Sequence, residues 1–362
     1  MIFVVVINLL AVLFTYLETK GQMKNGMKIG FILVTLVACL HYDFGSDYMD
    51  YYKLYKEVDS YNFTWATILD RDFFRDPGWL VLNWIFRWFG GFFGLVAVLN
   101  IIQNIAYYKF IRNYSSPERR TFSVFLYLFL TTFYMMNFSM MRQGLVIALF
   151  VAMWPLIEKR RWALSLLLIF LLSFIHKSVV LLYPFAFWGF VPVKNTKKYA
   201  IGGLVLLMAL YISQNFLSDV FDRFMLIDDF ENYSEKYTDN NTGHSRFGIG
   251  AFIQSFPFII AFLKLIGDND YTDTERRIIL LSLIGYLIVP FTSIIHLLGR
   301  AGWYFSAYAI VATPILFSSI KNNAVRLTLT SLYVLLVVYN LFVYYASISW
   351  NMSTYHTIFE VL

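Results

Sequence analysis

The residues in this sequence that could do chemistry are basic groups placed just before apolar runs. They are Arg142, His176, Lys177, Arg246 and Arg300. A cation at a helix start opposes the helix dipole, whose N-terminus carries about half a positive charge. Free N–H groups at a helix start, together with Arg or Lys side chains, commonly bind phosphate. The repeated placement therefore predicts an anion site with phosphate as its ligand.

A second interpretation of each basic residue stays open. A single Arg beside a bilayer can act as an interfacial anchor, with its stem in lipid and its head in water. Arg142 and Arg300 stand in short connections with few polar neighbours, which favours the anion site for these two. Arg246 ends a polar stretch, so simple solvation explains it equally well.

His176 is the candidate proton acceptor. It stands with Lys177 and Ser178 between two apolar runs in FIHKSVVLLYPF. A neutral imidazole there could take a proton from a hydroxyl nucleophile. The alternative is a buried histidine whose ring is satisfied by a backbone carbonyl.

Asp76, in RDPGW, is the most interesting acidic residue. Aspartate before proline is a good helix N-cap with proline at the first helical position, and a capping role is compatible with a functional carboxylate. Asp47 and Tyr51 belong to GSDYMDYYKLY, a mixture of acids and aromatic rings that suits sugar binding. The same mixture also suits an interfacial aromatic belt. No pattern in the sequence predicts a metal site or a cofactor.

Composition predicts the elements that must position these residues. The chain has 362 residues, of which 59% are apolar and 14% charged, whereas soluble domains carry about a quarter charged residues. Apolar runs of about 15–20 residues repeat along the chain, the pattern of an all-α, polytopic membrane protein. The net charge of +6 does not indicate nucleic acid binding, because in such a protein the distribution of charge matters more than its sum. Cys39 is the single cysteine, which excludes a disulfide framework.

The apolar runs predict about 12 crossings within one integral membrane domain, 1–362. They lie near 2–17, 29–42, 92–110, 121–137, 143–157, 162–175, 178–191, 199–217, 248–266, 278–296, 301–318 and 325–346. Two long loops, about 43–78 and 218–247, separate them. The segment PGWLVLNWIFRWFGG is too short to cross and is interpreted as a helix at the membrane interface.

Charge predicts the orientation of these spans. Eighteen of the 29 basic residues, but seven of the 23 acidic ones, fall on one set of connections. The positive-inside rule makes that set cytoplasmic, so both termini and both long loops are expected outside. The spans near 162–175 and 178–191 are too short for a core of about 30 Å, so the junction at His176 is expected below the outer surface.

The order of motifs resembles the EpsG family, bacterial membrane proteins grouped with the Wzy-type polymerases of exopolysaccharide, capsule and O-antigen synthesis. The motifs are DYMDYYKLY, RDPGW, NFSMMRQGLVIALF, FIHKSVVLLYPF and LGRAGWYF, spread over nearly the whole chain. The most specific parts are the pair Arg142-Gln143 and the His-Lys-Ser trio at His176. The acidic-Pro-Gly motif usually carries glutamate, and this sequence has the shorter Asp76 instead.

The resemblance implies a glycosyltransferase that polymerises undecaprenyl-pyrophosphate-linked oligosaccharide repeat units at the outer face of the bacterial cytoplasmic membrane. In that mechanism Arg142 and Arg300 stabilise the pyrophosphate leaving group, without a metal, and His176 or Asp76 activates the acceptor hydroxyl. The expected substrate-binding residues are Gln143, Lys177, Ser178, Arg246, Asp47 and Tyr51. Expected partners are membrane lipid, a flippase and a chain-length regulator. The alternatives are a flippase or transporter for lipid-linked oligosaccharide, and an extracytoplasmic glycan ligase or acyltransferase.

Overall fold

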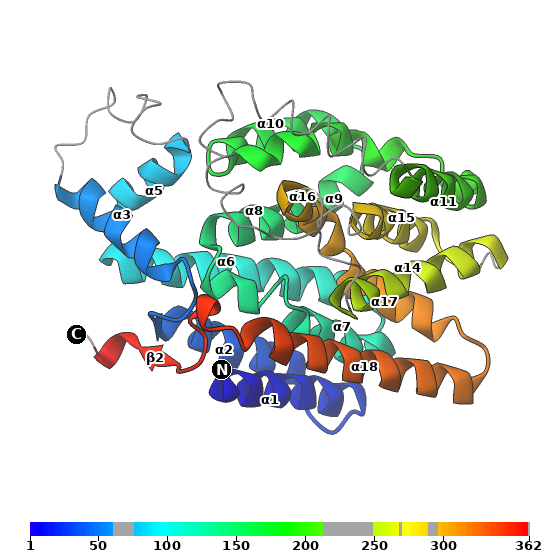
Figure 1. The fold of residues 1–362 in the computed structure, drawn as a ribbon, viewed down its shortest axis with the longest axis horizontal. Helices are drawn as coiled ribbons and strands as arrows, with labels where there is room; N and C mark the ends of the chain where they lie inside the picture. The colour runs from blue at the N-terminus through cyan, green and yellow to red at the C-terminus, as the bar shows by residue number, and fades with distance from the viewer. Residues whose placement is uncertain (61–75, 213–248, 268–269, 289–295, 361–362) are drawn as a thin grey trace. The chain divides into compact units, whose positions relative to one another are not determined.

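The computed structural model describes residues 1–60, 76–212, 249–267, 270–288 and 296–360. These residues are mostly helical (Figure 1). The described strands are a short antiparallel pair, β1 (His41–Tyr42) and β2 (His356–Thr357), in which His41 lies opposite Thr357. By its contacts the chain divides into two compact units, Met1–Val191 with Thr313–Leu362, and Pro192–Ala312.

The first unit is built on packed apolar helices. Its helices are α1 (Ile2–Thr19), α2 (Gly26–Leu40), α3 (Tyr48–Ser60), α5 (Pro77–Phe86), α6 (Gly91–Tyr114), α7 (Pro117–Phe129), η1 (Met135–Phe138), α8 (Met141–Ala152), α9 (Trp154–Glu158), α10 (Trp162–Ser173), η2 (Lys177–Phe190), α18 (Asn323–Tyr345), η6 (Ile348–Trp350) and η7 (Ile358–Glu360). Helix α1 packs on α2 and α7, and α6 packs on α2 and α8. Helix α8 is therefore enclosed by its neighbours, while α1 and α18 expose apolar faces.

The second unit is smaller. Its described elements are η3 (Val193–Asn195), α11 (Thr196–Ile212), α14 (Ile249–Gly267), α15 (Asp273–Ile288) and α16 (His296–Ser306); α17 (Ala309–Ser318) continues into the first unit. Helix α15 packs closely on α16, since a Cβ at Gly285 would lie 2.5 Å from Ser306 Oγ. Arg276 Nη1 donates a hydrogen bond to Thr196 Oγ1 at 3.1 Å and joins α15 to α11.

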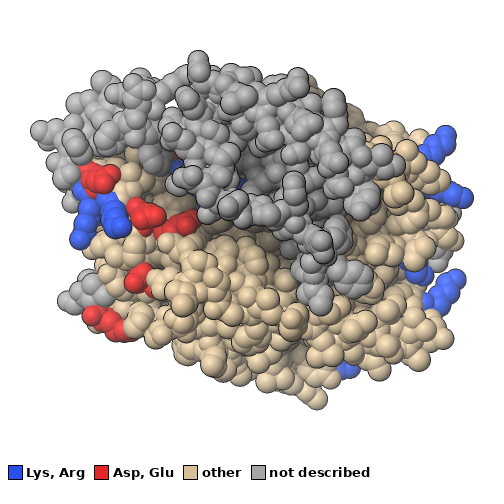
Figure 2. Space-filling view, in the orientation of Figure 1, with Lys and Arg blue, Asp and Glu red and all other residues tan. Residues whose placement is uncertain are grey.

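Four described helices are long and apolar enough to cross a membrane: α1, α6, the continuous pair α8–α9 (Met141–Glu158) and α18. The bent pair 300–306 and 309–318, with a 50° break, makes a fifth if it counts as one span. In the α8–α9 span 67% of the apolar stretch is buried inside the protein, whereas in α18 only 22% is buried. Helix α8 is therefore central and α18 peripheral. On the face that Figure 2 shows, uncharged side chains cover most of the described surface, as expected beside lipid. The chain is a helical membrane protein, and the count of 12 spans stays a prediction.

Two predicted spans differ in detail from the helices found. The run near 121–137 is α-helical to Phe129, after which Leu130 is extended and η1 follows as a separate 3-10 helix. The run near 178–191 is a 3-10 helix, η2, with Pro184 inside it. Proline has no N–H to donate and disfavours the preceding α-helical turn, which fits this departure. The segment predicted to lie at the interface forms the ten-residue helix α5.

Candidate functional site

The pair formed by Arg142 and Asp76 is the centre of the candidate site. Arg142 Nη1 lies 2.7 Å from Asp76 Oδ2, a charge-assisted hydrogen bond. The side chains are 26% and 8% exposed, so the pair is largely withdrawn from solvent. Asp76 is the N-cap residue of α5, but its side chain makes no capping hydrogen bond to that helix. The carboxylate of Asp76 therefore binds Arg142 and does not cap α5, although the sequence allowed both roles.

The position of Arg142 on its helix explains why a carboxylate is needed there. It is the second residue of α8, and the N-cap residue Met140 makes no side-chain cap. A guanidinium in the first turn meets the positive end of the helix dipole, which is unfavourable without a nearby anion.

Gly144 lets Asn137 approach from the preceding turn, since a Cβ at Gly144 would collide with Asn137 Oδ1. The start of α8 is thus held against a buried amide side chain.

The Pro-Gly sequence after Asp76 docks α5 onto the end of α10. Gly78 N–H donates to Phe174 O at 2.8 Å, and a Cβ at Gly78 would lie 2.8 Å from that same oxygen. A real Cβ does not approach this closely, so glycine is required at this position. Because Phe174 precedes His176 by two residues, this contact brings Asp76 near the turn that carries the candidate base.

Aromatic side chains pack beside the pair. Arg142 Cζ lies 5.5 Å from the ring centroid of Tyr51, a cation–π distance, and Arg142 Nε points to Tyr51 Oη at 3.5 Å. The Tyr51 ring meets Trp79 edge-on at 5.3 Å. Ile175, next to His176, packs against the same buried group. The buried group consists of Tyr48, Tyr51, Tyr55, Trp79, Phe92, Leu95, Val96, Leu99, Met141 and Leu145.

Helix α3, which carries Tyr51, is tied to the turn before α8. Ser46 Oγ lies 2.7 Å from Ser139 Oγ, and Asp47 N–H donates to Ser139 Oγ at 3.3 Å. Gly45 has φ +120, and a Cβ there would collide with Phe138 O, so the turn needs glycine. Tyr48 Oη donates to His41 O at 3.2 Å, and burial raises the pKa of this phenol above its usual value.

The structure brings together part of the predicted site. Arg142, Asp76 and Tyr51 are in contact, and Gln143 is buried beside Arg142. Asp47 lies at the start of α3, where its Oδ1 accepts a hydrogen bond from Ser46 Oγ at 3.0 Å. These residues share the region around the start of α8.

The remaining predicted residues are placed separately. His176 is half-buried between α10 and η2, with Lys177 exposed and Ser178 half-buried after it. Arg300 is half-buried on α16 in the second unit, so its convergence with Arg142 stays a prediction. Arg246 lies outside the described residues.

Sequence reasoning missed two features of the site. Trp79 is fully buried against Tyr51, and its signal was the PGW sequence that follows Asp76. His41 is fully buried, with Nδ1 2.6 Å from Ala38 O and its ring against Tyr48 and Phe138. Within the described residues, no group of three or more His, Cys, Asp or Glu side chains could hold a metal ion.

Comparison with known proteins decides the family. The model of the EpsG family matches residues 27–358 of the 362-residue chain. The chain belongs to the EpsG family. No curated protein and no solved structure matches it. Membership points to a polysaccharide polymerase-like role for this EpsG-family protein, in agreement with its apolar helices.

Proposed function

We propose that this EpsG-family protein polymerises oligosaccharide repeat units carried on undecaprenyl pyrophosphate. The observation that carries the proposal is the Arg142–Asp76 pair at the start of α8, beside aromatic side chains, in a membrane protein of this family. The products are exopolysaccharide, capsule or O-antigen, and the reaction takes place at the outer face of the bacterial cytoplasmic membrane with both termini outside. The whole chain acts as one polymerase domain.

Arg142 has the chemistry to stabilise the leaving group. When the bond from the glycan to the pyrophosphoryl lipid breaks, negative charge accumulates on the pyrophosphate. A guanidinium with helix N–H groups behind it stabilises that charge strongly where water is excluded. Arg300 is the proposed second arginine, and Lys177 or Arg246 holds the other phosphate. Arginines then do the work that a metal does in other transferases.

The acceptor hydroxyl needs a proton acceptor. We assign this role to His176 before Asp76, because Asp76 is already bonded to Arg142, whereas the Gly78–Phe174 contact docks α5 two residues from His176. Aromatic rings and carboxylates suit sugar binding, which supports Tyr51 and Asp47 as substrate contacts, with Gln143 and Ser178. His176→Ala should lower the turnover rate at least about 100-fold, and near-normal turnover would pass the role to Asp76.

The deciding experiment incubates the purified protein with lipid-linked repeat units in detergent. Polymerisation predicts a ladder of longer glycans, absent with Arg142→Lys, which keeps the charge and loses the guanidinium fork. A flippase or transporter would give no ladder in detergent but translocation in vesicles. A ligase or acyltransferase would consume a different acceptor without chain growth.

A further inference from the structure

We infer that Asp76 is a resident anion that occupies the pyrophosphate position on Arg142 and must be displaced by the donor. This inference rests on the proposed function and concerns the same site. It makes Asp76 a specificity-determining residue that sets how much charge a ligand needs in order to bind, and a group that promotes product release.

The carboxylate of Asp76 lies on the guanidinium of Arg142. A carboxylate oxygen 2.7 Å from Arg142 Nη1 occupies the place on the guanidinium where a phosphate oxygen would bind. The carboxylate comes from a different helix, 66 positions away in the chain, so it can leave without unwinding α8. A ligand that uses the N–H of Arg142 Nη1 that faces Asp76 therefore has to compete with this carboxylate.

The side chain of Asp76 has a second favourable position. It is the N-cap residue of α5, a ten-residue helix, and its side chain does not cap that helix while it holds Arg142. Aspartate is among the preferred N-cap residues, because its carboxylate accepts a hydrogen bond from the second or third N–H of the helix. Rotation of the side chain moves the charge from the start of α8 to the start of α5. The displaced carboxylate is thereby stabilised by its own helix.

The carboxylate of Asp76 affects which ligands bind Arg142. A single-charged phosphodiester offers Arg142 no more charge than Asp76 already does, whereas a pyrophosphate bridge brings a charge on each phosphate. The resident carboxylate therefore selects pyrophosphate over monophosphate carriers. After transfer the leaving pyrophosphate carries still more charge and binds most tightly, and the return of Asp76 to Arg142 speeds its release.

The test measures binding of inorganic pyrophosphate and of orthophosphate to the purified full chain in detergent by calorimetry. Asp76→Asn and Asp76→Ser both remove the charge and keep a residue that can cap α5. Both variants should bind pyrophosphate at least about tenfold more tightly than the unsubstituted protein does. In both variants, the ratio of the orthophosphate to the pyrophosphate dissociation constant should be smaller than in the unsubstituted protein. The matched control is Glu18→Gln, which removes the carboxylate of a second 2.7 Å pair, with Arg112, and should leave the dissociation constant unchanged.

Three outcomes overturn the inference. Unchanged or weaker pyrophosphate binding in a folded Asp76→Asn protein would make Asp76 an ordinary binding or proton-accepting group. Loss of folded protein in both Asp76 variants would make the pair a structural one. Tighter binding in Glu18→Gln as well would reveal a general charge effect. If the unsubstituted protein and both folded Asp76 variants all fail to bind pyrophosphate, the anion site is absent, and the proposed function then fails together with the inference.

Discussion

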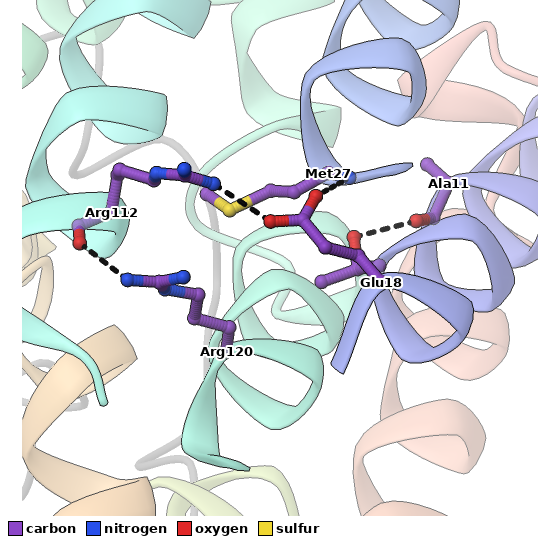
Figure 3. Close-up of polar contacts among 6 residues, drawn as sticks. Ala11, Glu18, Met27, Arg112 and Arg120 are labelled. Carbon is purple, nitrogen blue, oxygen red and sulfur yellow. Dashed lines mark hydrogen bonds and ion pairs between the residues drawn. The ribbon is translucent and has the colours of Figure 1, made fainter. Parts of the chain in front are cut away.

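Two arginine–carboxylate pairs in the first unit have the same geometry and different surroundings. Arg142 Nη1 lies 2.7 Å from Asp76 Oδ2, and Arg112 Nη1 lies 2.7 Å from Glu18 Oε1. Figure 3 shows Glu18 between Arg112 and the backbone of Met27, with Arg120 donating to Arg112 O at 3.1 Å. Distance alone does not separate a structural pair from a functional one.

The helix ends separate them. Arg112 is in the last turn of α6, where a cation is favoured by the dipole. Glu18 Oε2 accepts from Met27 N–H, at the second residue of α2, where an anion is favoured. Arg112 thus lies where its own helix stabilises it, and Glu18, although in the last turn of its own helix α1, is stabilised by the start of α2. Arg142, in contrast, lies at the start of its helix, where the dipole disfavours a cation. The surroundings of Arg142 therefore favour an additional anion.

The largest expected effect separates the two arginines. Arg142→Lys should reduce polymer formation at least about 100-fold, because the lysine loses the bidentate contact to the developing pyrophosphate charge. Arg112→Lys, at the structural pair, should stay within about threefold of normal, since a partly exposed pair contributes little. Glycan ladders normalised to the amount of protein in the membrane measure both. Equal losses for the two variants would remove the distinction between the pairs.

The second prediction concerns the glycine beside each pair. Gly78→Ala forces a Cβ against Phe174 O and should shift α5, with about tenfold or greater loss of polymerisation. Gly26→Ala forces a Cβ against Phe14 O at the other pair and should lower thermal stability. Activity per folded molecule, with melting in detergent, distinguishes a displaced site from a weakened fold. Normal activity per folded molecule in Gly78→Ala would contradict the importance of this docking.

The third prediction concerns Glu18 itself. Glu18→Gln weakens the bonds to Arg112 and to Met27 N–H and should lower the free energy of unfolding by about 1 kcal/mol, a modest figure because Arg112 is 40% exposed. Thermal melting in detergent measures the loss, and turnover should be unchanged once the protein is folded. A fall in turnover without a fall in melting temperature would give the Glu18 pair a role in catalysis.

The smallest expected effect concerns tyrosines near the two pairs. Tyr51→Phe keeps the ring beside Arg142 and removes an oxygen 3.5 Å from Nε, so the KM should rise by about threefold with little change in kcat. The comparison variant is Tyr114→Phe, on α6 near Arg112, which removes a hydrogen bond to Glu158 at 3.1 Å and should leave the KM unchanged. Initial rates over a range of donor concentrations measure both. An equal change in both variants would count against a substrate role for Tyr51.

Much of this protein could be predicted from its sequence because the relevant signals are local. Apolar runs predicted helices in lipid, and the helices α1, α6 and α18 follow those runs closely. The motif order predicted the EpsG family, which is confirmed. Arg142 and Asp76 were both selected as site residues from their positions at expected helix starts.

Only the tertiary structure decided which residues meet. Asp76 and Arg142 are 66 positions apart and Glu18 and Arg112 are 94 apart, so no local periodicity connects them. Close approaches of backbone accompany each pair, at Gly78 against Phe174 for the first and at Gly26 against Phe14 for the second, and they follow from packing many side chains at once. The apolar composition of each segment, and the charged residues that flank it, determine which segments enter the membrane, because solvation acts on each segment separately. Packing between distant segments determines the partner of each charge.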